Sequence, residues 1–352
     1  MPGGGPPAKI FLDWREAPHP PGMPGDIKQA PEGGETMKYA AKKIAAMLLT
    51  MVIVSLLAFT AFSLISGDAA EIILGTQATP ERLAALRAEL GLDRPLPVRY
   101  ISWLLGFFTG DLGISIKYNQ PVWDLIAPKV LVTLCLSILC FFLITIVSIP
   151  LGLCSAARSG GALDGLGTVF NQLCMAVPSF FTGILLSWGF GIALKWFMPG
   201  SFPELGSDFF GAVKYLFFAA IAIAIPRVAM TVRMLRGTIL TEMRRDYVRT
   251  AISRGAGWRR VLYRHVLKNA LAPVVTLLAQ TMAEIVAAGI VVEQVFVIPG
   301  LGRMLVASIS NRDYPVVQAI VVILAFWVVL AGTAADIINQ RIDPRLRLGG
   351  DT

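Results

Sequence analysis

Two charged side chains stand in segments that are otherwise apolar enough to cross a membrane. Glu284 lies near the middle of the apolar segment Leu271–Val292, and Arg227 interrupts the segment Gly211–Val232. An ionised side chain at membrane depth faces the protein interior or a watery pathway. Two interpretations follow and both stay open. Either one or both residues line a pathway, with Glu284 attracting a cationic group or a metal complex, or the two form an ion pair that locks their helices together.

The residue types needed for catalysis are missing from the apolar segments. An intramembrane hydrolase needs a Ser/His or paired-Asp arrangement at membrane depth, whereas both histidines, His19 and His265, lie outside these segments and Asp336 has no aspartate partner in them. The four cysteines form no CxxC pair, so neither a zinc site nor a disulfide framework is indicated. A GxxxxGK[ST] phosphate loop is also absent. We therefore expect no catalytic residue, no metal site and no cofactor bound by this chain.

A strongly basic segment separates two of the apolar segments. From Arg227 to Lys268 the chain carries eleven Arg or Lys residues against two acids. Helical periodicity continues through 237–254, glycines follow at 255 and 257, and Trp258–Lys268 is again periodic, with Val261, Leu262, His265 and Val266 on one side. We expect two short helices around a sharp glycine turn, protruding from the membrane to grip a soluble partner. The alternative is a plain basic loop that only fixes topology.

Composition places these elements in a membrane protein. The chain of 352 residues is 55% hydrophobic and 15% charged, and its mean hydropathy is +0.66, which is too apolar for an ordinary soluble domain. The net charge of +8 flanks the apolar segments, so nucleic acid is not an expected partner. A membrane-spanning helix needs about 20 apolar residues. Six segments qualify: Ile44–Ile65, Val130–Ala157, Gly165–Leu194, Gly211–Val232, Leu271–Val292 and Val316–Ile338.

Charge flanking the segments orients them. Because Lys and Arg accumulate on the cytoplasmic side, both termini and the basic segment 237–270 are expected in the cytoplasm, with a long external loop over 67–128. Residues 1–36 hold eight Pro and seven Gly, so we expect a disordered extension before a membrane domain over 37–347 and a short tail over 348–352. Translation from Met37 is an alternative start. In the external loop, Thr79 and Pro80 predict the start of a helix that Gly91 stops.

Several motifs resemble one family. The pattern Tyr-Val-x-Thr-Ala-x-x-x-Gly from Tyr247, followed by Arg-His-x-x-x-Asn-Ala-x-x-Pro from Arg264, resembles the EAA loop of ABC-importer permeases, and most closely the peptide/nickel branch. Colinear matches include Leu90-Gly91-Leu92-Asp93-Arg94-Pro95, Gly110-Asp111-Leu112-Gly113, Pro299-Gly300-Leu301-Gly302-Arg303 and Asn311-Arg312-Asp313-Tyr314-Pro315. His265 and Lys268 stand where other permeases often have isoleucine and proline, a departure that peptide-type permeases share. Arg227 departs from this family, which generally has an apolar or small residue there.

The resemblance implies a six-helix type I ABC importer permease in a bacterial or archaeal cytoplasmic membrane. Its implied partners are a second homologous permease, giving a heterodimer, two ATPase subunits that carry ATP and Mg²⁺, and an extracytoplasmic substrate-binding protein. ATPase contact is implied for Asp246, Tyr247, Arg249, Thr250, Ala251, Gly255, Gly257, Arg264 and His265, and the external side for Asp93, Pro95, Asp111, Gly300, Arg303, Asp313 and Tyr314. Di- and oligopeptides are the implied substrates. Nickel or a nickel chelate is the alternative, and a membrane scaffold or receptor is a remote one.

Overall fold

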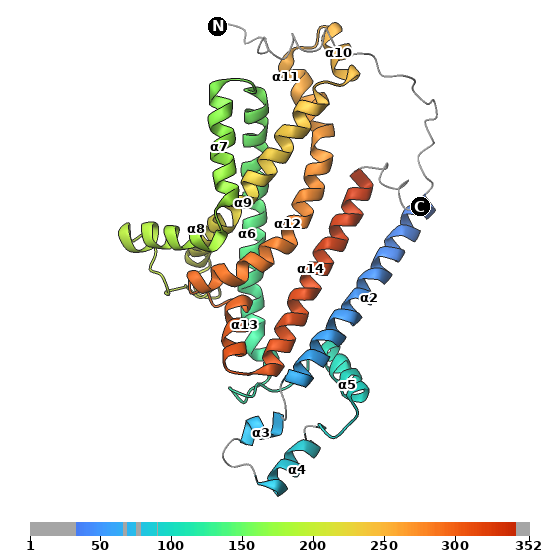
Figure 1. Ribbon diagram of the computed structural model, residues 1–352, viewed down its shortest axis with the longest axis vertical. Coiled ribbons are helices and arrows are strands. Elements are labelled where there is room, and N and C mark those ends of the chain that lie inside the picture. Colours follow the sequence, from blue (N-terminus) through green and yellow to red (C-terminus); the bar gives the residue numbers. More distant parts are fainter. Residues whose placement is uncertain (1–32, 66–68, 75–78, 90, 343–352) are drawn as a thin grey trace.

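The computed structural model describes residues 33–65, 69–74, 79–89 and 91–342, and this part of the chain is almost wholly helical (Figure 1). Its β-structure is confined to one isolated bridge between Ile114 and Pro121. Within the described residues, five helices contain a stretch long and apolar enough to cross a membrane, and a sharply bent helix pair supplies a sixth candidate. The prediction of an all-α membrane protein is confirmed. These five helices are α2 (Gly33–Ile65), α6 (Val122–Ala157), α9 (Phe209–Glu242), α12 (Leu267–Val295, preceded without a break by residues from Trp258) and α14 (Tyr314–Ile342).

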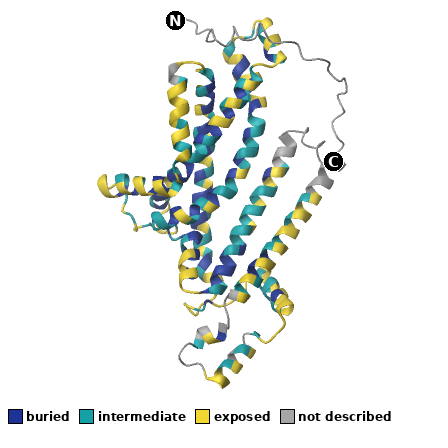
Figure 2. Cartoon of the chain, in the orientation of Figure 1, coloured by how far each residue is buried: buried dark blue, intermediate teal, exposed yellow. Residues whose placement is uncertain are grey.

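Helices α6, α9 and α12 form the centre of the molecule, and α2 lies along α14 at its edge (Figure 1). Small side chains on α9, such as Ala219 and Ala220, are fully buried and let the helices approach closely. A Cβ atom on Gly152 of α6 would come within 2.8 Å of the Leu235 side chain on α9, so this crossing needs a glycine. Large apolar side chains on α2, including Leu48 and Leu57, stay exposed, as a lipid-facing surface requires (Figure 2).

Polar contacts fix α2 against its neighbours. The Lys43 ammonium lies 2.6 Å from the Asp336 carboxylate on α14. The hydroxyl groups of Ser55 and Tyr100 are 2.8 Å apart, which ties α2 to α5 (Leu96–Thr109). The Phe59 ring packs edge-on against Tyr100. These contacts hold the peripheral helix in one orientation.

The third predicted span is broken. Gly165–Leu194 is predicted as one span, but α7 (Ala162–Ala176) ends before Pro178. Helix α8 (Ser179–Leu186) and the π-helical segment η2 (Ser187–Ala193) then run at 96° to α7 (Figure 1). The cause is local, because a proline forces the preceding residue out of the helical region, and Val177 is extended with φ −78° and ψ 122°.

Two helices begin earlier than predicted. Helix α6 starts at Val122 instead of Val130 because Val122 and Ile126 are fully buried, in the same cluster as residues of α13 (Leu301–Ser310) and α14. This packing outweighs the backbone hydrogen bond that Pro128 removes. Helix α2 starts at Gly33, so residues 33–36 are helical. The predictions for 1–32 and 348–352 lie outside the described residues.

The loop that was predicted to be external contains the predicted helix and a second, shorter one. Helix α4 (Pro80–Glu89) begins after Thr79, whose hydroxyl oxygen accepts the Arg82 N–H at 3.4 Å. Gly91 follows with φ +63°, the left-handed conformation that glycine adopts without steric cost. A short helix, α3 (Ala69–Leu74), precedes α4. Helix α5 begins at Leu96, directly after Pro95.

Candidate functional site

The basic segment forms a projecting tip at one end of α9 and α12 (Figure 1). The tip comprises residues 243–266 and contains α10 (Asp246–Ser253), α11 (Trp258–Arg260) and the π-helical segment η3 (Val261–Val266). The expected continuous helix over 237–254 is wrong, because α9 ends at Glu242 and Arg245 is extended with φ −73° and ψ 151°. The break turns α10 so that Val248, only 1% exposed, joins the main buried cluster with Val261.

Gly255 ends α10 as predicted. It has φ +82°, its N–H donates to the Ile252 carbonyl at 2.9 Å, and the next N–H, of Ala256, donates to the Ala251 carbonyl at 3.1 Å. This pair of bonds is the Schellman arrangement that closes a helix C-terminus with glycine. Gly257 has a different role, since its φ of −66° and ψ of 151° make it the extended residue before α11.

The second half of the tip differs from the prediction. Trp258 begins a helical run that reaches Val295 without a break, so this half is the start of a span and Pro273 lies inside that span. Val261, Leu262 and Val266 are buried, but His265 is exposed. The predicted common face is therefore wrong, because the wider turn of η3 shifts the register of the side chains. The apolar side chains hold the tip together instead of facing a partner.

Tyr247 and Ala251 are half-buried on the inner side of α10. The Tyr247 hydroxyl donates to the Glu242 carboxylate at 2.8 Å. Burial raises the pKa of the Tyr247 phenol above its ordinary value, and the Glu242 carboxylate acts in the same direction. The hydroxyl group therefore stays protonated and keeps donating, which joins the end of α9 to α10.

The other predicted contact residues of the tip are exposed and form its outer surface. Arg249 lies 3.6 Å from Asp246 one turn away, and the Thr250 hydroxyl donates to the Asp246 carbonyl at 3.1 Å. Arginines dominate the remaining charge, so this surface fits an acidic or polar groove on a soluble partner. The exposed predicted residues are Asp246, Arg249, Thr250, Gly255, Gly257, Arg264 and His265.

The two charged residues of the apolar segments meet. The Arg227 guanidinium on α9 forms an ion pair with the Glu284 carboxylate on α12. The side chains remain 28% and 45% exposed, respectively, so the pair is not sealed inside the helix bundle. Both earlier interpretations describe part of this geometry, because the two residues are paired and Arg227 also lines a space beside the pair.

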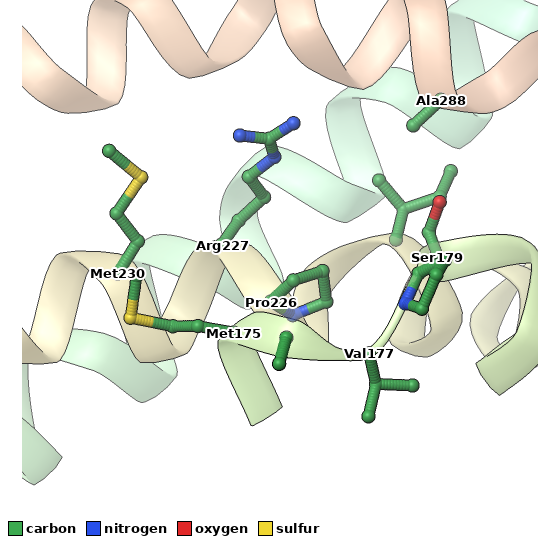
Figure 3. Close-up of a pocket in the computed structure, with 10 residues that line it drawn as sticks. Met175, Val177, Ser179, Pro226, Arg227, Met230 and Ala288 are labelled. Atoms are coloured by element: carbon green, nitrogen blue, oxygen red, sulfur yellow. The ribbon is translucent and has the colours of Figure 1, made fainter. Parts of the chain in front are cut away.

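That space is a hollow of about 240 Å³ at the break between α7 and α8. Arg227 extends along it from α9, while Pro178 and Ser179 at the break and Ala288 on α12 form further walls (Figure 3). Met175 and Met230 complete one end. The extended backbone at Val177 and Pro178 thus opens a partly polar space next to the ion pair.

A second hollow, of about 430 Å³, follows along the same face of α9. It shares Met230 with the first and includes Leu277 from α12. We call the surface of both hollows on α9 the α9 groove; its residues are Arg227, Met230, Arg233, Met234, Gly237, Thr238 and Thr241. The spacing of three, four and seven residues places them on one helix face. The groove runs from the ion pair toward the tip.

The opposite end contains a buried carboxylate that the sequence analysis missed. Glu293 of α12 is fully buried and accepts the Thr133 hydroxyl at 2.7 Å and the Arg303 N–H at 3.0 Å. It thereby provides an acceptor for a backbone N–H group in the first turn of α13, which has no partner within the helix. A Cβ on Gly300 would overlap the Glu293 carboxylate, and a Cβ on Gly302 would lie 2.4 Å from the Ile290 Cα and 3.0 Å from a Glu293 carboxylate oxygen. The Gly-x-Gly spacing before Arg303 was the available signal, because two glycines can make room for a side chain from elsewhere.

Some of the residues predicted to be external lie at the end of the molecule that contains α13, and the others lie in the loop over 67–128. Asp313 is buried and accepts the Ser115 hydroxyl at 2.5 Å and the Ile116 N–H at 3.1 Å, so it ties the loop to the start of α14. The Arg303 guanidinium donates to the Val297 carbonyl at 3.0 Å, and the Tyr314 ring lies near Phe62. Asp111 caps a local turn through the Gly113 N–H. Asp93 and Pro95 lie apart from this cluster, before α5.

The spans, the projecting tip and the half-open groove together define a multi-pass membrane protein of the transporter class. Comparison with known proteins specifies the family. Residues 148–348 match the family described as "Binding-protein-dependent transport system inner membrane component", and residues 36–137 match its N-terminal companion, "Binding-prot-dependent transport system membrane comp, N-term". The chain belongs to this family of inner-membrane permeases of ABC importers, and its helical fold fits the type I class.

Relatives cover almost the whole chain. A probable peptide ABC transporter permease of Sinorhizobium fredii is 32% identical over 88% of this chain and 99% of its own length. A putative peptide transport system permease of Brucella abortus is 35% identical over 87% and 98%. The dipeptide transport system permease DppB of Escherichia coli K12 is 31% identical over 88% and 99%. These names describe transport permeases, so the prediction of a transporter subunit instead of an enzyme is confirmed.

Proposed function

We propose that this chain is a permease subunit that imports di- and oligopeptides and takes its energy from separate ATPase subunits. The similarity to peptide permeases along nearly the full chain is the observation that carries the substrate class. The α9 groove supports it, because a path lined by arginine and methionine suits a polar chain with varied side chains.

In this proposal the tip lies in the cytoplasm and binds one ATPase subunit. Its support is the ordered, exposed surface around Asp246, Arg249 and Gly255, braced from below by buried Val248 and Val261. Such a rigid, protruding element transmits a push to α9 and α12, which both continue from it. Closure of the ATPases on ATP then rocks the spans and alternates the access of the central path.

The remaining partners complete the assembly. A second, homologous permease forms the other half of the path in a heterodimer, with one ATPase beneath each permease. The end that contains Glu293 and Asp313 faces outward, where a substrate-binding protein delivers the peptide. The family description, which names dependence on a binding protein, supports this arrangement.

Uptake into proteoliposomes tests the proposal. The four-subunit assembly is reconstituted with the binding protein and a radiolabelled tripeptide, with ATP inside the vesicle lumen where the ATPases face. We expect uptake that needs ATP, the binding protein and the ATPases together. Uptake by the permeases alone, without ATPase subunits, would contradict the ABC mechanism. An ATP-dependent assembly that moves no peptide would contradict the substrate class.

A further inference from the structure

We propose that Arg233 is a binding station for the C-terminal carboxylate of the substrate and that Arg227 is a second station, with Glu284 as its displaceable counter-ion. The inference rests on the proposed peptide-import function and specifies which chemical group of a peptide the path recognises. The α9 groove is lined by the positively charged side chains of Arg227 and Arg233.

Arg233 follows the apolar segment Gly211–Val232 on α9, and its charge has no internal partner. Its side chain is exposed in the second hollow, and no hydrogen bond or ion pair to it forms within the described part of the chain. Nearby Arg236 differs, since its guanidinium binds the Asp164 carboxylate at 2.7 and 3.2 Å. A guanidinium that lines a hollow and has no counter-ion there is available to bind an anionic ligand.

The surroundings of Arg233 favour a carboxylate. Among the described residues, the two hollows are lined by two guanidinium groups and by no carboxylate, and the nearby Glu284 carboxylate already pairs with Arg227. The hydroxyl groups of Thr238 and Thr241 donate to backbone carbonyls of their own helix, so they do not neutralise Arg233. Guanidinium groups bind carboxylates through two parallel hydrogen bonds. The groove therefore attracts the anionic end of a zwitterion.

The geometry provides two successive stations. Arg227 and Arg233 are six residues apart on one helix, about 9 Å at a rise of ~1.5 Å per residue, and Met230 lies between them in both hollows. Thioether side chains adapt to varied neighbours, so the walls accept different peptide side chains while the arginines hold the constant carboxylate. When the substrate carboxylate replaces Glu284 at Arg227, the Arg227 guanidinium stays paired at each step.

Uptake of a peptide and its amide tests this inference. Wild type, Arg233→Gln and the control Arg158→Gln, which removes an exposed arginine outside the groove, are each assembled with the same partner subunits and binding protein. Initial ATP-dependent uptake is measured for a tripeptide with a free C-terminal carboxylate and for its C-terminal amide. Because the binding protein is common to all arms, only changes between permease variants count.

We expect Arg233→Gln to lower uptake of the free acid about tenfold, the size of one lost charge-assisted hydrogen-bonded pair, and to leave uptake of the amide within about twofold. Arg158→Gln should change neither. Equal loss for both peptides, or no loss, overturns the inference and leaves the proposed function standing. Failure of Arg233→Gln to co-purify with the second permease also overturns it, since Arg233 then belongs to the permease interface. No ATP-dependent uptake of either peptide by wild type overturns both.

Discussion

Arg227 on α9 pairs with Glu284 on α12, and the Arg227 side chain also lines the first hollow. Helices α9 and α12 are the two that enter the tip, so any movement that separates or slides them acts directly on this pair. A fully buried pair would act as a lock, because breaking it leaves an uncompensated charge. A half-exposed pair can exchange partners at much lower cost.

Substitution Glu284→Gln should preserve assembly and reduce peptide import. The loss of one half-exposed partner costs at most about 1 kcal/mol of stability, while the unpaired Arg227 holds a substrate carboxylate more tightly and slows its release. We expect normal size-exclusion profiles and uptake reduced several-fold. The control is the double variant Arg227→Glu/Glu284→Arg, which restores pairing but moves the guanidinium. Recovery of uptake in that swap would show that pairing alone matters.

Gly255→Ala should loosen the tip, whereas Gly257→Ala should not. An added methyl group meets no atom within 4 Å at either position, so the difference lies in the backbone. Alanine at the left-handed Gly255 costs about 1–2 kcal/mol, but alanine suits the extended conformation of Gly257. We expect faster tryptic cleavage after Arg254 and reduced substrate-stimulated ATPase activity for Gly255→Ala alone. Identical behaviour of the two variants would refute the role of the left-handed turn.

Glu293→Ala should destabilise the end that contains α13. It removes the acceptor for the Thr133 hydroxyl and the Arg303 N–H in a buried place, which costs about 1–3 kcal/mol for each group left unsatisfied. Thermal unfolding in detergent should show a clearly lower midpoint than wild type. Glu204→Ala, at an exposed loop position, is the matched control and should leave the midpoint unchanged. An unchanged midpoint for Glu293→Ala would contradict the capping role.

Asp164→Asn should weaken the attachment of α7 to α9. The Asp164 side chain is 10% exposed and accepts two bonds from Arg236 and one from the Gly160 N–H. The neutral amide loses this charge-assisted pairing, at a cost of about 2–3 kcal/mol. Thermal unfolding in detergent should show a lower midpoint for Asp164→Asn. The control is Asp246→Asn, which should shift the midpoint less because the pairing of Asp246 with Arg249 is solvent-exposed. Equal shifts for the two variants would contradict the difference in burial.

Sequence patterns predicted the five spanning helices α2, α6, α9, α12 and α14 because hydropathy and length are local properties, but they did not predict the 96° bend between α7 and α8. They also predicted Gly255, whose positive φ only glycine adopts easily. Two errors arose where distant residues decide the backbone. Burial of Val248 in the cluster that contains Val261 turns α10 away from α9, and burial of Val122 and Ile126 starts α6 before Pro128. Neither contact is visible in a hydropathy window.

The functional residues divide in the same way. Arg227 and Glu284 were recognisable because a charge in an apolar segment is conspicuous, but their pairing required the packing of α9 on α12. Glu293 was missed because it lies at the end of its helix, where a charge is ordinary. Its importance comes from Thr133 and Arg303, which approach it from other elements. Arg233 was counted only as part of a basic segment.

Photocrosslinking from the tip tests the central claim most directly. A benzophenone amino acid is placed at Thr250 on the tip or, as control, at Ser310 at the opposite end, both exposed positions. The complete importer is then irradiated in membranes. The account predicts a crosslink from position 250 to an ATPase subunit and none from position 310. A crosslink to the ATPase from position 310, or to the substrate-binding protein from position 250, would contradict it.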